Sequence, residues 1–135
     1  MGVDKDRWKY SNTSVHNLGY HIIWCTKYRR RLLTDEIQIR LKELIGIKCN
    51  ELEVELCTIE TMPEHVHIFI KSKPTLSPHY ILRQIKGFTS RKLREEFNSL
   101  KSRTPTLWTR SYFVESVGCI NEETIKKYIE NQKNK

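Results

Sequence analysis

The chain has 135 residues, 38% of them hydrophobic, and its 24 Lys and Arg residues against 16 Asp and Glu residues give a formal net charge of +8. This length fits one domain, and no stretch approaches the run of about 18 apolar residues that marks a membrane helix. The basic balance favours a polyanionic partner, most often nucleic acid, but charge alone does not separate DNA from RNA or from an anionic membrane.

The N-terminus and the cysteines both indicate a cytoplasmic protein. The polar start of the chain is not a secretory signal, and residues 1–17 are expected to form a flexible arm ahead of a single domain, residues 18–135. Four cysteines occur without a CxxC pair or zinc-finger spacing: Cys25, Cys49, Cys57 and Cys119. We interpret all four as reduced structural residues, and we expect Cys25 and Cys57, which fall in strand-like runs, to be buried.

A strand, a helix and a hairpin are predicted in the first half of the domain. Residues 20–26 (YHIIWCT) are β-branched and aromatic, as in a strand, and a basic loop, residues 27–31, follows. Thr34 can cap a helix whose apolar residues recur at helical spacing. Residues 54–61 and 65–72 are predicted to form two strands joined by a short turn, and therefore an antiparallel hairpin.

The second half repeats the order of helix and strand. Ser77 and Pro78 are a cap and a first-turn proline that begin a helix. A fourth strand is predicted over residues 107–117 and is expected to end at Gly118, and a last helix is predicted from residue 122 to about 132. The order predicts an α+β fold of the ferredoxin-like split β-α-β type: a four-stranded antiparallel sheet with two helices on one face, plus a C-terminal helix.

The third predicted strand carries two histidines, His65 and His67, at alternate positions. Alternate side chains of a strand share a face, so Val66 and Ile68 should pack under the helices while His65, His67 and Phe69 point to the open face. Two imidazoles at this spacing can bind one metal ion. The motif is weak alone, because two half-exposed sheet histidines without a metal have the same pattern.

The last predicted helix carries Tyr128 and Gln132 four residues apart, so both project from one side. A phenol and an amide oxygen presented together can supply a nucleophile and a metal ligand. Alternatively, Tyr128 packs beside Ile125 and Ile129, and Gln132 is solvated.

Together these motifs, His-hydrophobic-His on a strand and Tyr-x-x-x-Gln on a terminal helix, resemble those of the HUH nucleases. More narrowly, the chain resembles the single-tyrosine transposases of the smallest bacterial and archaeal insertion sequences, from about Val15 to Gln132. The landmarks in chain order are residues 20–29, 62–67, 85–87, 90–91 and 128–132. Glu64 stands where Asp is common in that family, which keeps the charge.

The resemblance implies a metal-dependent transposase acting on single-stranded DNA with hairpins at the ends of the element. In that family the two histidines and the glutamine, here His65, His67 and Gln132, hold Mg or Mn. Tyr128 is then the catalytic nucleophile that forms a 5′-phosphotyrosine, so that cutting and joining need no ATP. Imidazole suits softer ions better than Mg, so Mg rests on the resemblance alone. The resemblance also implies a cytoplasmic, nucleoid-associated location.

A homodimer with a shared active site is expected. The last helix has few apolar residues, mainly Ile125 and Ile129, so its own chain has little to hold it. Exchange of such a terminal element is a low-cost route to a symmetric dimer, and the resemblance points the same way.

DNA contacts are predicted from basic and aromatic residues. Phosphate contacts are expected from residues of the basic loop and the second helix: Arg29, Arg30, Arg31, Arg83, Lys86, Arg91 and Lys92. Any one of them alone is more often a solvated surface charge. Candidates for stacking on unpaired bases are Trp8, Tyr10, Tyr28 and Trp108, although some of these must belong to the core.

Two alternatives stay open. A non-catalytic ferredoxin-like nucleic-acid-binding domain would place aromatic residues on the open sheet face and have no use for Tyr128. A domesticated HUH nickase would keep the same chemistry in another role.

Overall fold

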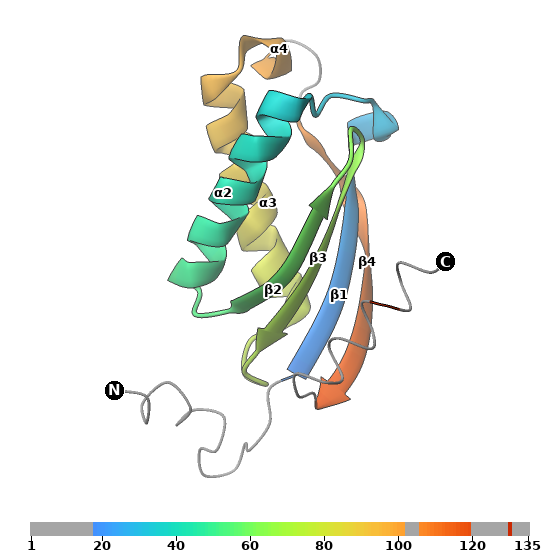
Figure 1. Cartoon of the computed structure of the whole chain (residues 1–135), viewed down its shortest axis with the longest axis vertical. Helices are drawn as coiled ribbons and strands as arrows, with labels where there is room; N and C mark the ends of the chain where they lie inside the picture. Colours follow the sequence, from blue (N-terminus) through green and yellow to red (C-terminus); the bar gives the residue numbers. More distant parts are fainter. Residues whose placement is uncertain (1–17, 102–105, 120–129, 131–135) are drawn as a thin grey trace.

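The structure, a computed structural model, describes residues 18–101, 106–119 and 130. Two helices cover one face of a single sheet (Figure 1). The elements are β1 (Leu18–Thr26), η2 (Lys27–Arg29), α2 (Asp35–Glu51), β2 (Glu55–Thr61), β3 (His65–Ser72), α3 (Pro78–Glu96), α4 (Asn98–Lys101) and β4 (Trp108–Cys119). The predicted N-terminal arm and the predicted last helix lie outside the described residues, apart from Glu130.

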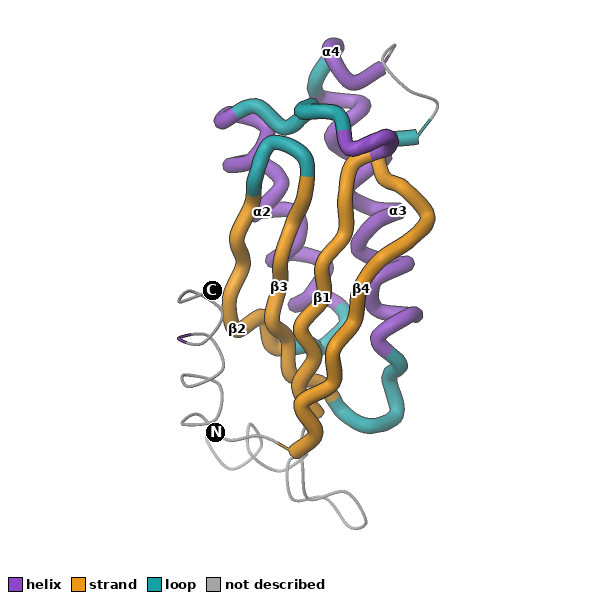
Figure 2. Tube along the Cα trace, turned by 90° about the vertical axis from the view of Figure 1, so that its right-hand side faces the viewer, coloured by secondary structure: helices purple, strands orange, loops and turns teal. Residues whose placement is uncertain are grey.

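The four strands form one antiparallel sheet in the order β2-β3-β1-β4 (Figure 2). The first and third strands are thus the central pair, and each βαβ half contributes one edge strand, which confirms the predicted split β-α-β plan. The register sets the neighbours of the histidine strand: His67 of β3 lies opposite Ile23 of β1 and Glu60 of β2.

Side-chain caps begin both long helices where the sequence predicts them. The Thr34 hydroxyl accepts a hydrogen bond from the Ile37 amide at 3.3 Å, and the Ser77 hydroxyl accepts one from the Tyr80 amide at 3.0 Å. The predicted end of the last strand at Gly118 is wrong. The strand continues to Cys119 because Gly118 pairs with Gly19 of β1 instead of turning.

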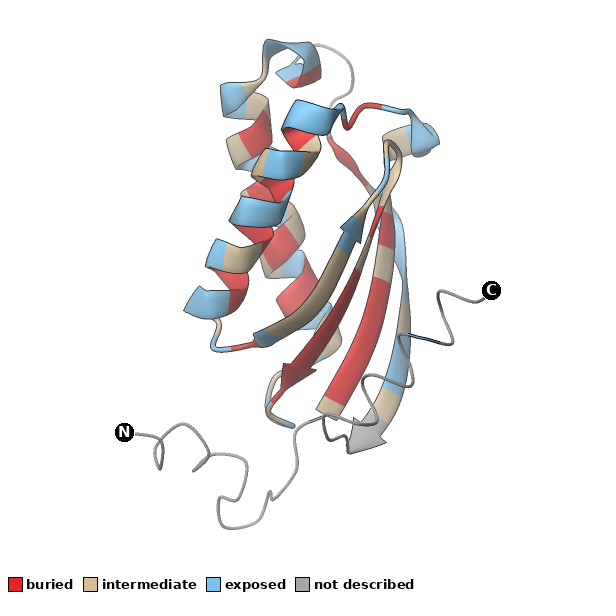
Figure 3. Ribbon diagram, in the orientation of Figure 1, coloured by how far each residue is buried: buried red, intermediate tan, exposed pale blue. Residues whose placement is uncertain are grey.

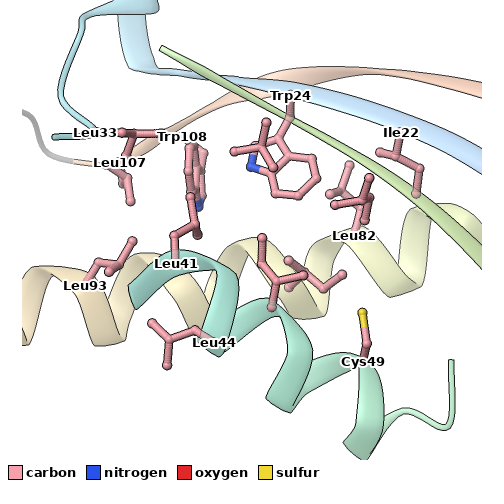
Figure 4. Close-up of a cluster of buried hydrophobic side chains, with 14 of the residues drawn as sticks. Ile22, Trp24, Leu33, Leu41, Leu44, Cys49, Leu82, Leu93, Leu107 and Trp108 are labelled. Carbon is pink, nitrogen blue, oxygen red and sulfur yellow. The ribbon is translucent and has the colours of Figure 1, made fainter. Parts of the chain in front are cut away.

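The core lies between the sheet and the two helices, where buried residues line the facing sides (Figure 3). Trp24 of β1 and Trp108 of β4 meet edge to face with ring centroids 5.8 Å apart, above Leu41 of α2 (Figure 4). The Trp108 indole also donates a 3.0 Å hydrogen bond to the Thr89 hydroxyl. Trp108, a candidate for base stacking, is therefore a core residue.

The described cysteines are free thiols: Cys25, Cys49 and Cys57. Cys49 is the buried one, and burial raises the pKa of its thiol to about 12. The expected burial of Cys25 and Cys57 is wrong, because both are only half-buried; Cys25 lies opposite His65, on the face that the helices leave open. Within the described residues no helix is long and apolar enough to cross a membrane.

Candidate metal and DNA site

The strand β3 separates its side chains as the alternation predicts. Val66 and Ile68 are buried in the helix-side core, whereas His65 and His67 are half-buried on the other face. Phe69 shares their parity and lies outside the helix-side core cluster, yet only 1% of it is exposed. Phe69 itself therefore offers no exposed ring to a nucleic acid, whereas Phe113 of β4, opposite Ile23 on the same face, is 52% exposed.

The two histidines lie side by side on this face. The ring centroids of His65 and His67 are 4.9 Å apart. Burial, followed by the neighbouring imidazoles of His65 and His21, lowers the pKa of His67, and the carboxylate of Glu60 only partly opposes this. A neutral imidazole keeps a lone pair for a metal ion, so the environment of His67 favours its ligand form.

Glu64 fixes the orientation of His65. Its Oε1 lies 2.8 Å from His65 Nδ1, and its Oε2 accepts a 3.1 Å hydrogen bond from the Arg31 guanidinium. An ionised carboxylate only accepts, so Nδ1 carries a proton, and in the neutral imidazole the lone pair is then on Nε2. From the sequence, Glu64 was noted only because Asp is common at this position in the family, and its carboxylate was given no role. Its position directly before the first histidine was the available signal.

A third imidazole, that of His21, also faces this site and was missed from the sequence. Its ring centroid lies 5.6 Å from that of His67, and its Nδ1 lies 4.0 Å from a carboxylate oxygen of Glu115. Burial lowers the pKa of His21, against the opposing effect of Glu115 and Glu60. The available signal was the alternation of side chains along β1. His21 is three residues before Trp24, so the two side chains lie on opposite faces of the sheet.

His65 and His67 are two side chains that can bind a metal ion, and His21 lies next to them. Among the described residues no group of three His, Cys, Asp or Glu side chains is placed to hold a metal ion. An ion held by this pair would take its further ligands from another residue type, from residues outside the described part of the chain or from water. Tyr128 and Gln132 lie outside the described residues, so their roles remain predictions.

The predicted DNA-contacting residues differ in how available their charges are. Arg29 and Arg30 are exposed on the loop after β1, and Arg31 is exposed but paired with Glu64. On α3, Arg83 and Arg91 are exposed and Lys92 is half-buried. The ammonium of Lys86 donates to the Thr109 carbonyl at 2.6 Å, and burial lowers its pKa. Lys86 thus ties α3 to β4.

A hollow of about 530 Å³ opens on the surface of α3 near α4. Its lining combines small residues with three cationic side chains and one carboxylate: Gly87, Ser90, Arg91, Arg94, Glu95, Lys101 and Thr106. Arg91, a predicted phosphate contact, therefore belongs to a concave basic surface.

The family described as "Transposase IS200 like" matches residues 14–132. The chain belongs to this family. As an IS200-like transposase, it is a DNA-processing enzyme, and the resemblance drawn from the sequence motifs is confirmed. The chain is 32% identical over 123 residues to ISDra2 transposase TnpA of Deinococcus radiodurans, which covers 90% of this chain and 88% of that protein.

Solved structures agree with the fold. A crystal structure described as a transposase of Deinococcus radiodurans R1 superposes with a TM-score of 0.74 at 33% identity, covering 90% of this chain and 95% of the other. A REP-associated tyrosine transposase bound to a REP hairpin superposes with a TM-score of 0.59 over 84% of this IS200-like chain and 62% of its own. At 15% identity that second likeness shows the shared fold alone.

Proposed function

We propose that this IS200-like transposase cleaves and rejoins single-stranded DNA at insertion-sequence ends through a phosphotyrosine on Tyr128, next to a metal ion bound by His65 and His67. The observation that supports this most is the histidine pair on the open face of the sheet, with His65 oriented by Glu64. A binding domain without chemistry has no need of two adjacent imidazoles, one of them oriented by a carboxylate.

The described residues fit a divalent metal ion. In the neutral tautomer of His65, Glu64 engages Nδ1 and leaves the lone pair on Nε2, and the lowered pKa of His67 favours its neutral form. Gln132 is the proposed third ligand, and three protein ligands leave open positions for a phosphate. Mg or Mn bound there would supply Lewis-acid stabilisation of negative charge on the scissile phosphate.

Tyr128 is the proposed nucleophile. Its phenolic oxygen forms a bond to phosphorus while the bond from phosphorus to the leaving 3′-oxygen breaks. This gives a 5′-phosphotyrosine and a 3′-hydroxyl on the other fragment. The phenol, whose ordinary pKa is about 10, must lose its proton, and Lys126 or Lys127 nearby in sequence would favour the phenolate. Attack of a new 3′-hydroxyl reverses the step and joins the strands.

The proposed substrate is single-stranded DNA flanked by hairpins. The exposed cations of the loop after β1 and of α3 suit a phosphate backbone. One relative of the same fold is described as bound to a REP hairpin. Efficient cutting of fully paired linear DNA would count against this substrate.

A homodimer with composite active sites is part of the proposal. Among the described strands β4 pairs only with β1, and an edge strand of this kind can pair with a second copy. Mixing a Tyr128→Phe chain with a His65→Ala/His67→Ala chain tests the sharing. Activity that reappears from two inactive parents supports a site built by two chains, and a mixture that stays inactive supports sites within one chain.

The deciding experiment incubates the protein with single-stranded DNA that carries the element's ends, with and without Mn. A covalent protein–DNA adduct on a denaturing gel is expected only with metal. Tyr128→Phe should abolish the adduct and retain DNA binding, because it removes one hydroxyl and keeps the ring. An undiminished adduct in that variant eliminates Tyr128 as nucleophile. DNA binding without any adduct would instead identify a non-catalytic binding domain.

A further inference from the structure

The loop after β1, residues 27–31, presents an exposed aromatic ring at the end of the sheet that holds the histidines. Tyr28 is 71% exposed, the largest exposure among the large hydrophobic side chains of the described residues. Folding gains nothing from an aromatic ring left in water.

The backbone at this ring is strained. Tyr28 has φ 59° and ψ 18°, and the next residue, Arg29, has φ 53°. Both lie in the left-handed region, which costs free energy for residues with a Cβ. Such conformations persist where the surroundings fix them, and they gather at functional sites.

Hydrogen bonds on both sides hold the loop in this shape. The Thr26 hydroxyl donates to the Arg30 carbonyl at 2.6 Å, closing the loop across its base. The Lys27 amide donates to the Leu107 carbonyl at 2.8 Å, and the Leu32 amide donates to the Arg30 carbonyl at 2.8 Å. The ring is thus carried by a fixed support and needs little ordering on binding.

The same loop is attached to the turn that precedes the histidine strand. The Thr26 amide donates to the Glu64 carbonyl at 2.9 Å, and Arg31 pairs with the Glu64 carboxylate that orients His65. Figure 1 shows the loop, in blue, beside the green turn between β2 and β3. A DNA strand whose phosphate lies at the histidines therefore passes close to this loop.

Two cationic groups lie close to the Tyr28 ring. Lys27 Nζ lies 5.3 Å and the Arg30 guanidinium 5.6 Å from the centre of the Tyr28 ring, and Arg29 and Arg31 complete a run of basic side chains. An aromatic ring among cations is the combination that binds unpaired nucleic acid, because phosphates meet the cations and a base stacks on the ring.

We propose that Tyr28 is a stacking platform for an unpaired nucleobase beside the phosphate held at His65 and His67, with the cations of residues 27–31 holding the adjoining backbone. The inference rests on the proposed function, since it names the single-stranded substrate's contact at that site. A duplex keeps its bases stacked on one another, so the platform selects single strands.

The test compares two single strands of equal charge, an oligothymidylate of about 12 nucleotides and an all-abasic strand of the same length. Equilibrium binding is measured by fluorescence anisotropy without divalent metal. The wild type is expected to prefer the strand with bases. Tyr28→Ala should reduce that preference roughly five-fold or more, the effect of one lost stack, whereas Tyr28→Trp should keep it.

Matched variants separate stacking from charge and from folding. Tyr80→Ala removes an exposed tyrosine at the start of α3, the opposite end of the sheet, and should keep the wild-type preference. Arg30→Ala should weaken binding to both strands equally. Tyr28→Asn tolerates the left-handed backbone better than Ala and should lose the preference equally, which separates the missing ring from a disturbed loop.

The outcomes distinguish this inference from the cleavage proposal. An unchanged preference in Tyr28→Ala, or a wild type that binds both strands equally or neither, overturns the platform. Adduct formation with Mn alongside an unchanged preference removes the platform and leaves cleavage standing. A preference that depends on Tyr28, without any adduct, establishes the platform and removes cleavage.

Discussion

Oε1 of Glu64 lies 2.8 Å from Nδ1 of His65, so the residue before the histidine motif holds the first histidine in place. The other oxygen of the same carboxylate accepts a 3.1 Å hydrogen bond from the Arg31 guanidinium. Arg31, Glu64 and His65 therefore form a chain from the basic loop to the proposed metal site. An arrangement in which a carboxylate orients a histidine ligand and raises its basicity is common around protein-bound metals.

Removing this carboxylate should weaken metal binding. We expect Glu64→Ala to lower Mn affinity about 10- to 100-fold, since His65 loses the acceptor that sets its orientation. Glu64→Gln, which keeps an acceptor without the charge, should fall between this variant and the wild type. Isothermal titration calorimetry measures both. Glu55→Ala, which breaks an ion pair with Lys71, is the control and should leave the affinity unchanged.

The histidines themselves should matter more than Gln132. His65→Ala or His67→Ala should lower metal affinity and cleavage together, because both imidazoles lie on a central strand. Gln132→Ala should have a smaller effect, since the glutamine is predicted near the end of a terminal helix.

His21 tests whether the site has two or three histidine ligands. Its ring lies beside that of His67, so an effect of His21→Asn as large as that of His67→Ala would make it a ligand. We expect the affinity of His21→Asn to stay within a few-fold of the wild type. The Mn affinities of the variants are compared by isothermal titration calorimetry. If excess Mn activates the wild type and the His65→Ala and His67→Ala variants equally, the metal assignment is refuted.

Cys49 should make stability fall at alkaline pH. Its pKa is about 12 in the folded protein against 9.0 ordinarily. The contribution of the buried, protonated thiol to the free energy of unfolding is therefore fully present below pH 9. Above pH 9 the unfolded chain loses the thiol proton while the folded chain keeps it, and stability declines with rising pH. The loss should reach about 1.4 kcal/mol at pH 10. Urea denaturation at several pH values should show this decline in the free energy of unfolding for the wild type and a correspondingly smaller decline for Cys49→Ala. The smaller side chain can also lower the stability of Cys49→Ala by an amount that does not change with pH.

The cap of α3 should contribute measurably to stability. Ser77→Ala removes the acceptor for the Tyr80 amide and should lower the free energy of unfolding by about 1 kcal/mol. Ser77→Asp, which restores an acceptor, should recover most of the loss. Thermal or urea denaturation measures both variants. A Ser77→Ala protein as stable as the wild type would show that the observed 3.0 Å hydrogen bond contributes nothing.

The elements that the sequence determined are those governed by local periodicity. The strand period of two already placed His65 and His67 on one face and Val66 on the other, and the cap residues Thr34 and Ser77 already marked both helix starts. The order of these elements was then enough for the split β-α-β fold, because few arrangements satisfy short antiparallel connections. The roles of Tyr128 and Gln132 came from motif resemblance and stay predictions.

Only the tertiary structure decided which side chains meet. It buried Trp108 against Trp24 and left Tyr28 exposed, although both aromatic residues looked alike as stacking candidates. It also brought His21 beside His67 and joined Arg31 to Glu64. These contacts depend on the register of β1 against β3 and on the docking of helices onto one face. Both are set by packing between segments far apart in the chain, which no local pattern of residues encodes.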